Sequence, residues 1–298
     1  MNKKLMAILG TVAVGGVLLG TTAFAAISGT SGYDVYKEAL KNTYAVNSIT
    51  PKTEVTVKDN GKLLFKVDAI SKLDKEKESM SNSVTVTSGG LQKTVDMYRQ
   101  DNKTVIKSSD SSVYNVLQRG RERNHKKEWR EDDPGRIKDI ENVADALTGT
   151  IQNYITLNSN PDGTKEVALQ LSDKQISPII NAVASLMVKN LDKELKHMGN
   201  KPMDFAFENS LQDKLPRLVD NIRVSHIDVE AKINKDNLIQ EQTENITITG
   251  TDAKGNGHEV VINIDTGFSN YNSTTPDTVD LSGKQVNIIS PENYRHEK

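Results

Sequence analysis

The feature that most constrains the fold is a two-residue alternation of apolar and polar side chains, repeated in short segments along the chain. Over residues 227–233 every second residue is apolar, and the residues between them are two acids and a lysine. Such alternation predicts a strand with one buried face and one solvated face. A polar turn follows at residues 235–237, and apolar residues return over 238–248 and again over 260–264.

The same alternation occurs between residues 55 and 116, with turns at 59–61, 89–90 and 100–102. A further hairpin is expected around the Asn-Pro-Asp-Gly turn at 160–163. Short strands joined by such turns are mostly antiparallel, because a parallel neighbour requires a long crossover connection. The strands therefore predict an antiparallel meander.

Three segments have helical rather than alternating periodicity: 33–46, 137–147 and 177–198. The order is helix, strands, two helices with a hairpin between them, and strands again. This order predicts an α+β fold, in which a curved antiparallel sheet or open half-barrel is covered by helices.

The helix at 177–198 has the clearest end signals. Ser177 is a natural N-cap, Pro178 suits the first helical position, and Gly199 suits the residue just past the end. Its apolar stripe needs an apolar partner, and the sheet is the available one. The sheet and this helix are expected to enclose either a filled core or an apolar ligand. The candidate residues that would face this ligand are Phe65, Val67, Ile179, Val183, Met187, Ile227 and Val229.

The first 25 residues have the pattern of an export signal. Lys3 and Lys4 precede an uncharged apolar run, and Ala23 and Ala25 supply the small side chains that signal peptidase requires. We expect a signal peptide over residues 1–25 and an exported protein, either secreted or held on the extracytoplasmic face of the membrane. The alternative is an uncleaved anchor, since the uncharged run is about long enough to cross a bilayer.

Composition excludes several classes of protein. The chain has no cysteine, which rules out disulfides, thiolate metal sites and a lipid-anchored lipoprotein. A formal net charge of −2 gives no general attraction to nucleic acid, so no nucleic-acid partner is expected.

Recognisable catalytic motifs are absent. His258-Glu259 begins like a zinc-protease helix, but Ile262 stands where the second histidine is needed. The Gly-x-Ser-x-Gly and Ser-x-x-Lys patterns do not occur. We expect no enzyme activity, no metal and no cofactor. A hydrolase whose carboxylates come together only on folding is a lesser alternative.

One strongly basic segment spans residues 119–130 and contains the single tryptophan. It could contact an anionic membrane or wall polymer. Alternatively, its charges pair with one another and with the acids at 131–133. The residues concerned are Arg119, Arg121, Arg123, Lys126, Lys127, Trp129 and Arg130.

The first helix leads into a meander, and the chain closes with three strands joined by Asn-Lys-Asp-Asn and Lys-Gly-Asn-Gly turns. This order resembles the LolA-like lipoprotein-carrier superfamily, which includes exported proteins of Gram-positive bacteria. The resemblance is architectural and spans residues 33–268. It implies an open barrel with a helical lid that binds acyl chains, and it assigns a role to no single residue.

The expected organisation is therefore a signal peptide or anchor, a LolA-like α+β domain over 26–268, and a polar C-terminal extension over 269–298 with one strand at 286–289. The leading hypothesis is an exported, envelope-associated or secreted binding module that holds an apolar or acyl ligand. A structural or protein-interaction domain with a filled core is the alternative.

Overall fold

The computed structural model describes residues 31–118, 151–178, 180–182, 184–185 and 214–289, and the structural statements below refer to these residues. They contain twelve strands in one sheet, in the order β12-β6-β5-β4-β3-β2-β1-β11-β10-β9-β8-β7. The strands are β1 (Ser48–Asp59), β2 (Lys62–Asp74), β3 (Ser79–Ser88), β4 (Leu91–Gln100), β5 (Lys103–Ser108), β6 (Tyr114–Gln118), β7 (Ile155–Ser159), β8 (Lys165–Ser172), β9 (Asp220–Ile233), β10 (Ile239–Thr251), β11 (Gly257–Ser269) and β12 (Val286–Ile289).

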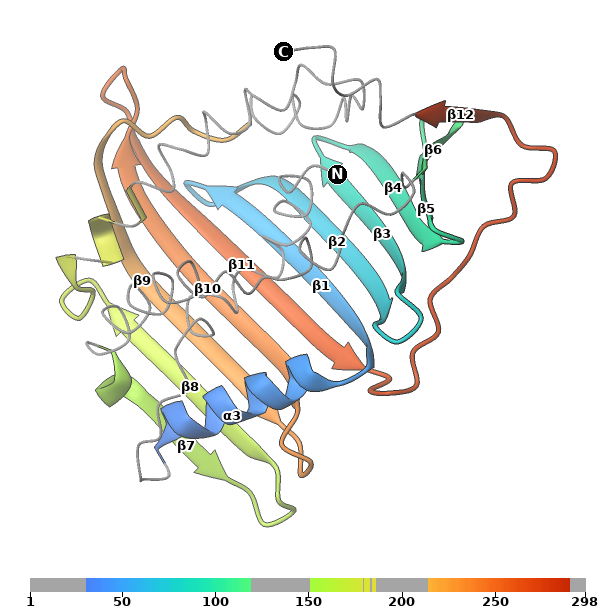
Figure 1. Ribbon diagram of the computed structural model, residues 1–298. Helices are drawn as coiled ribbons and strands as arrows, with labels where there is room; N and C mark the ends of the chain where they lie inside the picture. Colours follow the sequence, from blue (N-terminus) through green and yellow to red (C-terminus); the bar gives the residue numbers. More distant parts are fainter. Residues whose placement is uncertain (1–30, 119–150, 179, 183, 186–213, 290–298) are drawn as a thin grey trace, which may run out of the picture.

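The predicted antiparallel sheet is confirmed. Every neighbouring pair of strands is antiparallel except β12 and β6, which are parallel. The outer strands β7 and β12 do not pair with each other, so the sheet is twisted but not closed (Figure 1). The predicted strand at 286–289 is present as β12.

The described residues are mostly β, which corrects the α+β expectation. They include the helix α3 (Gly32–Ala45) and the short 3-10 helix η2 (Gln152–Tyr154). The helix predicted at 137–147 lies outside the described residues. The one predicted at 177–198 is described only in its first turns, where the N-cap is confirmed because Ser177 Oγ accepts a hydrogen bond from the Ile180 N–H.

Helix α3 follows the prediction for 33–46 to within one residue at each end. Ser31 caps it, because its hydroxyl oxygen accepts a hydrogen bond from the Asp34 N–H. The buried side chains include Val35, Tyr36 and Ala39, which face the sheet. Helix α3 contacts β7, β8, β9 and β10, and it lies across one end of these strands (Figure 1).

One row of directly paired residues crosses eight strands and defines what we call the apolar row. Its register follows from the strand pairings, and the alternation along each strand places all its members on one face. All but Glu244 are apolar. In order from β7 to β3, the row is Ile155, Leu169, Val229, Glu244, Ile264, Val55, Val67 and Val86.

The buried apolar residues form two clusters on this face. The first cluster lies under α3 and is built mainly from β8, β9 and α3. The second cluster lies on β1, β2, β3 and β11 and is covered in part by Leu215, Leu218 and Ile222. The apolar row runs through both clusters, and Glu244 stands between them.

Residues 270–285 carry the chain from β11 to the far edge of the sheet (Figure 1). The Asp277 N–H donates to Ser81 Oγ, and Gln100 both donates to the carbonyl of Val279 and accepts from its N–H. This long connection allows β12 to join β6 in the parallel direction.

Close approach of α3 to β7 gives a first prediction. A Cβ atom on Gly32 would lie 3.0 Å from both Ile155 Cγ2 and the carbonyl oxygen of Thr156. We expect Gly32→Ala to lower the free energy of unfolding by about 1–3 kcal/mol, because the helix must move away from the strand. Gly267→Ala is the control, since a Cβ on Gly267 meets no atom within 4 Å. Urea denaturation measures both, and equal effects would contradict the close packing.

Candidate functional site

The structure describes four of the seven apolar candidates. Phe65, Val67, Ile227 and Val229 are buried and belong to the two apolar clusters. Val67 and Val229 also lie in the apolar row, on β2 and β9. The remaining apolar candidates, Ile179, Val183 and Met187, have no described side chains.

The seven candidates for an anionic surface all fall outside the described residues. They are Arg119, Arg121, Arg123, Lys126, Lys127, Trp129 and Arg130. Their contact with a membrane or wall polymer stays a prediction.

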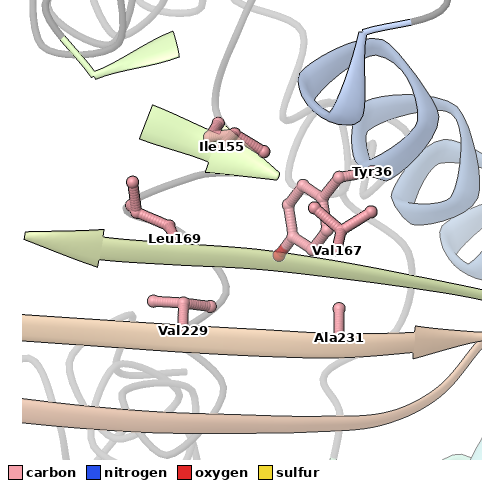
Figure 2. A pocket seen from close by; sticks show the side chains of 6 residues that line it. All are labelled: Tyr36, Ile155, Val167, Leu169, Val229 and Ala231. Carbon is pink, nitrogen blue, oxygen red and sulfur yellow. The ribbon is translucent and has the colours of Figure 1, made fainter. Parts of the chain in front are cut away.

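The interface between α3 and the sheet is almost filled. A cavity of about 10 Å³ remains there, which is roughly the space of one water molecule. Figure 2 shows the Tyr36 ring directed from α3 toward the strands that form the rest of the lining. The lining residues are Tyr36, Ile155, Val167, Leu169, Val229 and Ala231. This end of the face is therefore a packed core.

The unusual group on the apolar face is Glu244. It lies on β10 between Val229 of β9 and Ile264 of β11, and only 6% of it is exposed. Sequence reasoning missed it, although a signal exists. Glu244 is two residues before Ile246 and four before Ile248, so its position on β10 belongs to the apolar side of the alternation.

A chain of hydrogen bonds holds Glu244 in place. The Tyr36 hydroxyl donates to Gln242 Oε1 at 2.8 Å, and Gln242 Nε2 donates to Glu244 Oε1 at 2.6 Å. The second carboxyl oxygen, Oε2, is buried and has no hydrogen-bond partner among the described residues. The helix α3 thus orients the carboxyl group through Gln242.

Burial raises the pKa of Glu244 from 4.5 to about 7, and the hydrogen bond from Gln242 opposes this shift only in part. Burial also raises the pKa of Tyr36, which therefore stays neutral. Because Oε1 accepts the Gln242 amide hydrogen, the proton of a neutral Glu244 carboxyl belongs on Oε2. In that state Oε2–H is a hydrogen-bond donor on an apolar surface.

A second polar group, His258, lies at the opposite end of the sheet. Its Nδ1 is 2.9 Å from Asp59 Oδ2, and its Nε2 is 3.7 Å from Asp252 Oδ2. The hydrogen bond with Asp59 is the main cause of a raised His258 pKa. The ring thus joins the β1–β2 turn to the β10–β11 turn. The expected Lys-Gly-Asn-Gly turn is confirmed, because Thr251 of β10 pairs with Gly257 of β11.

An open cavity of about 670 Å³ adjoins His258, and two of its polar lining side chains bond to neighbouring residues. The Asn60 side chain bonds the backbone of Gly257 and Glu259, and Arg223 bonds Thr249 and Asp173. In the part of the chain that the structure describes, no three or more His, Asp or Glu side chains are grouped to hold a metal ion. The arrangement is that of a structural contact between hairpins.

Among the described helices, none is long and apolar enough to cross a membrane.

Comparison with known proteins gives no family. No protein-family model matches the chain, and no curated protein matches it. Among solved structures, the chain is similar to a DUF1329 family protein from Desulfovibrio piger, at 12% identity over 84% of this chain and 94% of that one, with a TM-score of 0.20. It is also similar to a beta-barrel-like protein of DUF1849 from Brucella abortus, at 11% identity over 76% of this chain and 100% of that one, with a TM-score of 0.19.

These TM-scores are too low to carry an argument about fold or function. The resemblance to the LolA-like superfamily therefore stays a prediction.

The buried carboxyl predicts how stability varies with pH. Between the ordinary pKa of 4.5 and the folded value of about 7, the folded chain keeps a proton on Glu244 that the unfolded chain has lost. The free energy of unfolding therefore falls as pH rises through this window, by about 3 kcal/mol in all, and the loss persists above it. Glu244→Gln keeps the acceptor for Gln242 and removes the titration.

We expect the stability of this variant relative to the wild type to rise by about 3 kcal/mol between about pH 4.5 and about pH 8. Urea denaturation across this range measures it. Glu241→Gln is the matched control on the exposed side of β10, where the side chain pairs with Lys232. A pH-independent difference for Glu244→Gln would contradict the buried neutral acid.

His258 predicts a loss of stability in the same direction, because its pKa is also raised in the folded chain. Its stabilising contribution is complete below the ordinary pKa of 6.5 and is lost as pH rises through the raised value. We expect His258→Gln to speed amide exchange in the turns at 59–61 and 252–257 at low pH, with a smaller effect at high pH. The remote turn at 160–163 is the internal control, and equal exchange in the variant and the wild type would contradict the contact.

Proposed function

We propose that the protein is an exported binding module of the cell envelope that holds an apolar chain of a lipid on the apolar face of its sheet. One observation carries this function. The apolar row extends over eight paired strands, a width of about 34 Å at ~4.8 Å per strand. An elongated apolar ligand could lie along it once α3 has moved away from Ile155, Leu169 and Val229, which the helix covers.

The covering segments favour a ligand in this place. Helix α3 covers the end formed by β7 to β10, and Ile180 and Ala184 pack on the same first cluster. Leu215, Leu218 and Ile222 pack on the second cluster. Helix α3, Ile180, Ala184, Leu215 and Leu218 lie outside the strands, whereas Ile222 belongs to β9. The covers other than Ile222 can therefore part from the sheet without disrupting its strand pairing. Export itself rests on residues 1–25 and stays a prediction.

The alternative is a structural or protein-interaction domain with a filled core. The cavity of only about 10 Å³ beside Tyr36 favours it, because no acyl chain fits there without movement of α3. The two functions differ in a measurable way. A carrier retains or takes up an acyl compound, whereas a filled core does not.

The test combines extraction with a pair of variants. Native mass spectrometry and lipid extraction of the full chain should detect a bound acyl compound, and the fluorescent fatty acid cis-parinaric acid should bind after its removal. Val86→Phe fills space on the apolar row, whereas Thr87→Phe adds the same ring to the opposite face of β3.

We expect Val86→Phe to weaken probe binding roughly tenfold, a loss of about 1.4 kcal/mol, and Thr87→Phe to leave it unchanged. Far-UV circular dichroism checks that both variants fold. If wild-type protein contains no acyl compound and does not bind the probe, the filled-core alternative holds.

A further inference from the structure

If the core served stability alone, an apolar side chain would be expected at the position of Glu244. It occupies the fourth position of the apolar row, where Val229 and Ile264 flank it. Its free Oε2 atom leaves a buried polar group without a hydrogen bond among the described residues. Such a group costs about 1–3 kcal/mol, and native proteins retain few of them.

No charge on the neighbouring described elements explains the carboxyl group. Tyr36 is the ionisable residue that α3 turns toward it, and that hydroxyl is neutral and already donates to Gln242. On either side, β9 presents Val229 and β11 presents Ile264. Along β10 the neighbours on the same face are Gln242 and Ile246. The described surroundings thus satisfy Oε1 and leave the buried Oε2 without a hydrogen-bond partner.

We propose that Oε2 of Glu244 is the polar anchor of the apolar face and donates a hydrogen bond to the carbonyl oxygen of an acyl ligand. This inference rests on the proposed function and specifies its ligand as an amphiphile with an acyl carbonyl. The carbonyl belongs either to an ester, as in a glyceride, or to the carboxyl group of a free fatty acid. The hydrocarbon part lies along the apolar row.

The anchor works in one protonation state. The neutral acid carries its proton on Oε2 and can donate it to a carbonyl oxygen. The ionised group has only lone pairs, so it repels a carbonyl oxygen and repels a fatty carboxylate more strongly. Because burial places the pKa of Glu244 at about 7, binding of the carbonyl should weaken as pH rises through neutrality.

The experiment separates the hydrocarbon from the carbonyl. Diphenylhexatriene, a fluorescent hydrocarbon without oxygen, reports occupation of the apolar face of the delipidated full chain. Methyl oleate and oleic acid, each delivered from cyclodextrin, then displace it at about pH 6 and about pH 8. We expect methyl oleate to bind roughly tenfold more tightly at the lower pH, the ratio of neutral Glu244 at the two values, while diphenylhexatriene binds equally at both.

The variants decide the role of Glu244. In Glu244→Gln the amide N–H donates at every pH, so methyl oleate should bind equally tightly at both values. Glu241→Gln, on the exposed side of the same strand, should keep the wild-type pH dependence. Oleic acid should show a larger loss at high pH than methyl oleate if the carrier accepts free fatty acids, and should fail to displace the reporter if it takes only esters.

The two proposals fail in different ways. If diphenylhexatriene does not bind the wild-type chain, the apolar face holds no ligand and both proposals are overturned. If it binds and methyl oleate displaces it with the same pH dependence in Glu244→Gln as in the wild type, the binding function stands and the anchor is overturned.

Discussion

The pairing of β1 with β11 is the contact on which the rest of the structure depends. Ten residue pairs join these strands, from Thr50 with Ser269 to Asp59 with Val260. They connect the N-terminal meander of β1 to β6 with the strands β7 to β11. Without this register the apolar row would break between Ile264 and Val55, and a slip of one residue would turn one half of the apolar face toward water.

Local features of the fold were predictable from the sequence because they depend on neighbouring residues. Alternation located the strands, polar turns located the hairpins, and Ser177 located a helix start. The β1–β11 pairing was not predictable in this way, since no local pattern says which of several alternating strands meets another. The same holds for β12, whose parallel pairing with β6 depends on the anchored segment at 270–285.

In the candidate site, too, the local features were predictable from the sequence and the long-range contacts were not. That Phe65 and Val67 share a face follows from their spacing of two, whereas the alignment of Val67 with Val229 in one row requires the register of four strand pairs. Likewise, His258 meets Asp59 only because β1 and β11 bring two distant turns together. Glu244 could have been identified from the sequence, because the alternation along β10 places it on the same face as Ile246 and Ile248.

Tyr36 links the packing of α3 to the chemistry of the apolar face. Its ring fills the first cluster, and its hydroxyl orients Gln242, which in turn holds Glu244 Oε1. Movement of α3 away from the sheet would therefore open space beside Val229 and also release Gln242 from the hydrogen bond that orients it. Under the proposed function, access to the apolar row and the orientation of its carboxyl group are coupled through this one side chain. A purely apolar residue at position 36 would pack the same cluster without that coupling, which gives the tyrosine hydroxyl a role that core stability alone does not require.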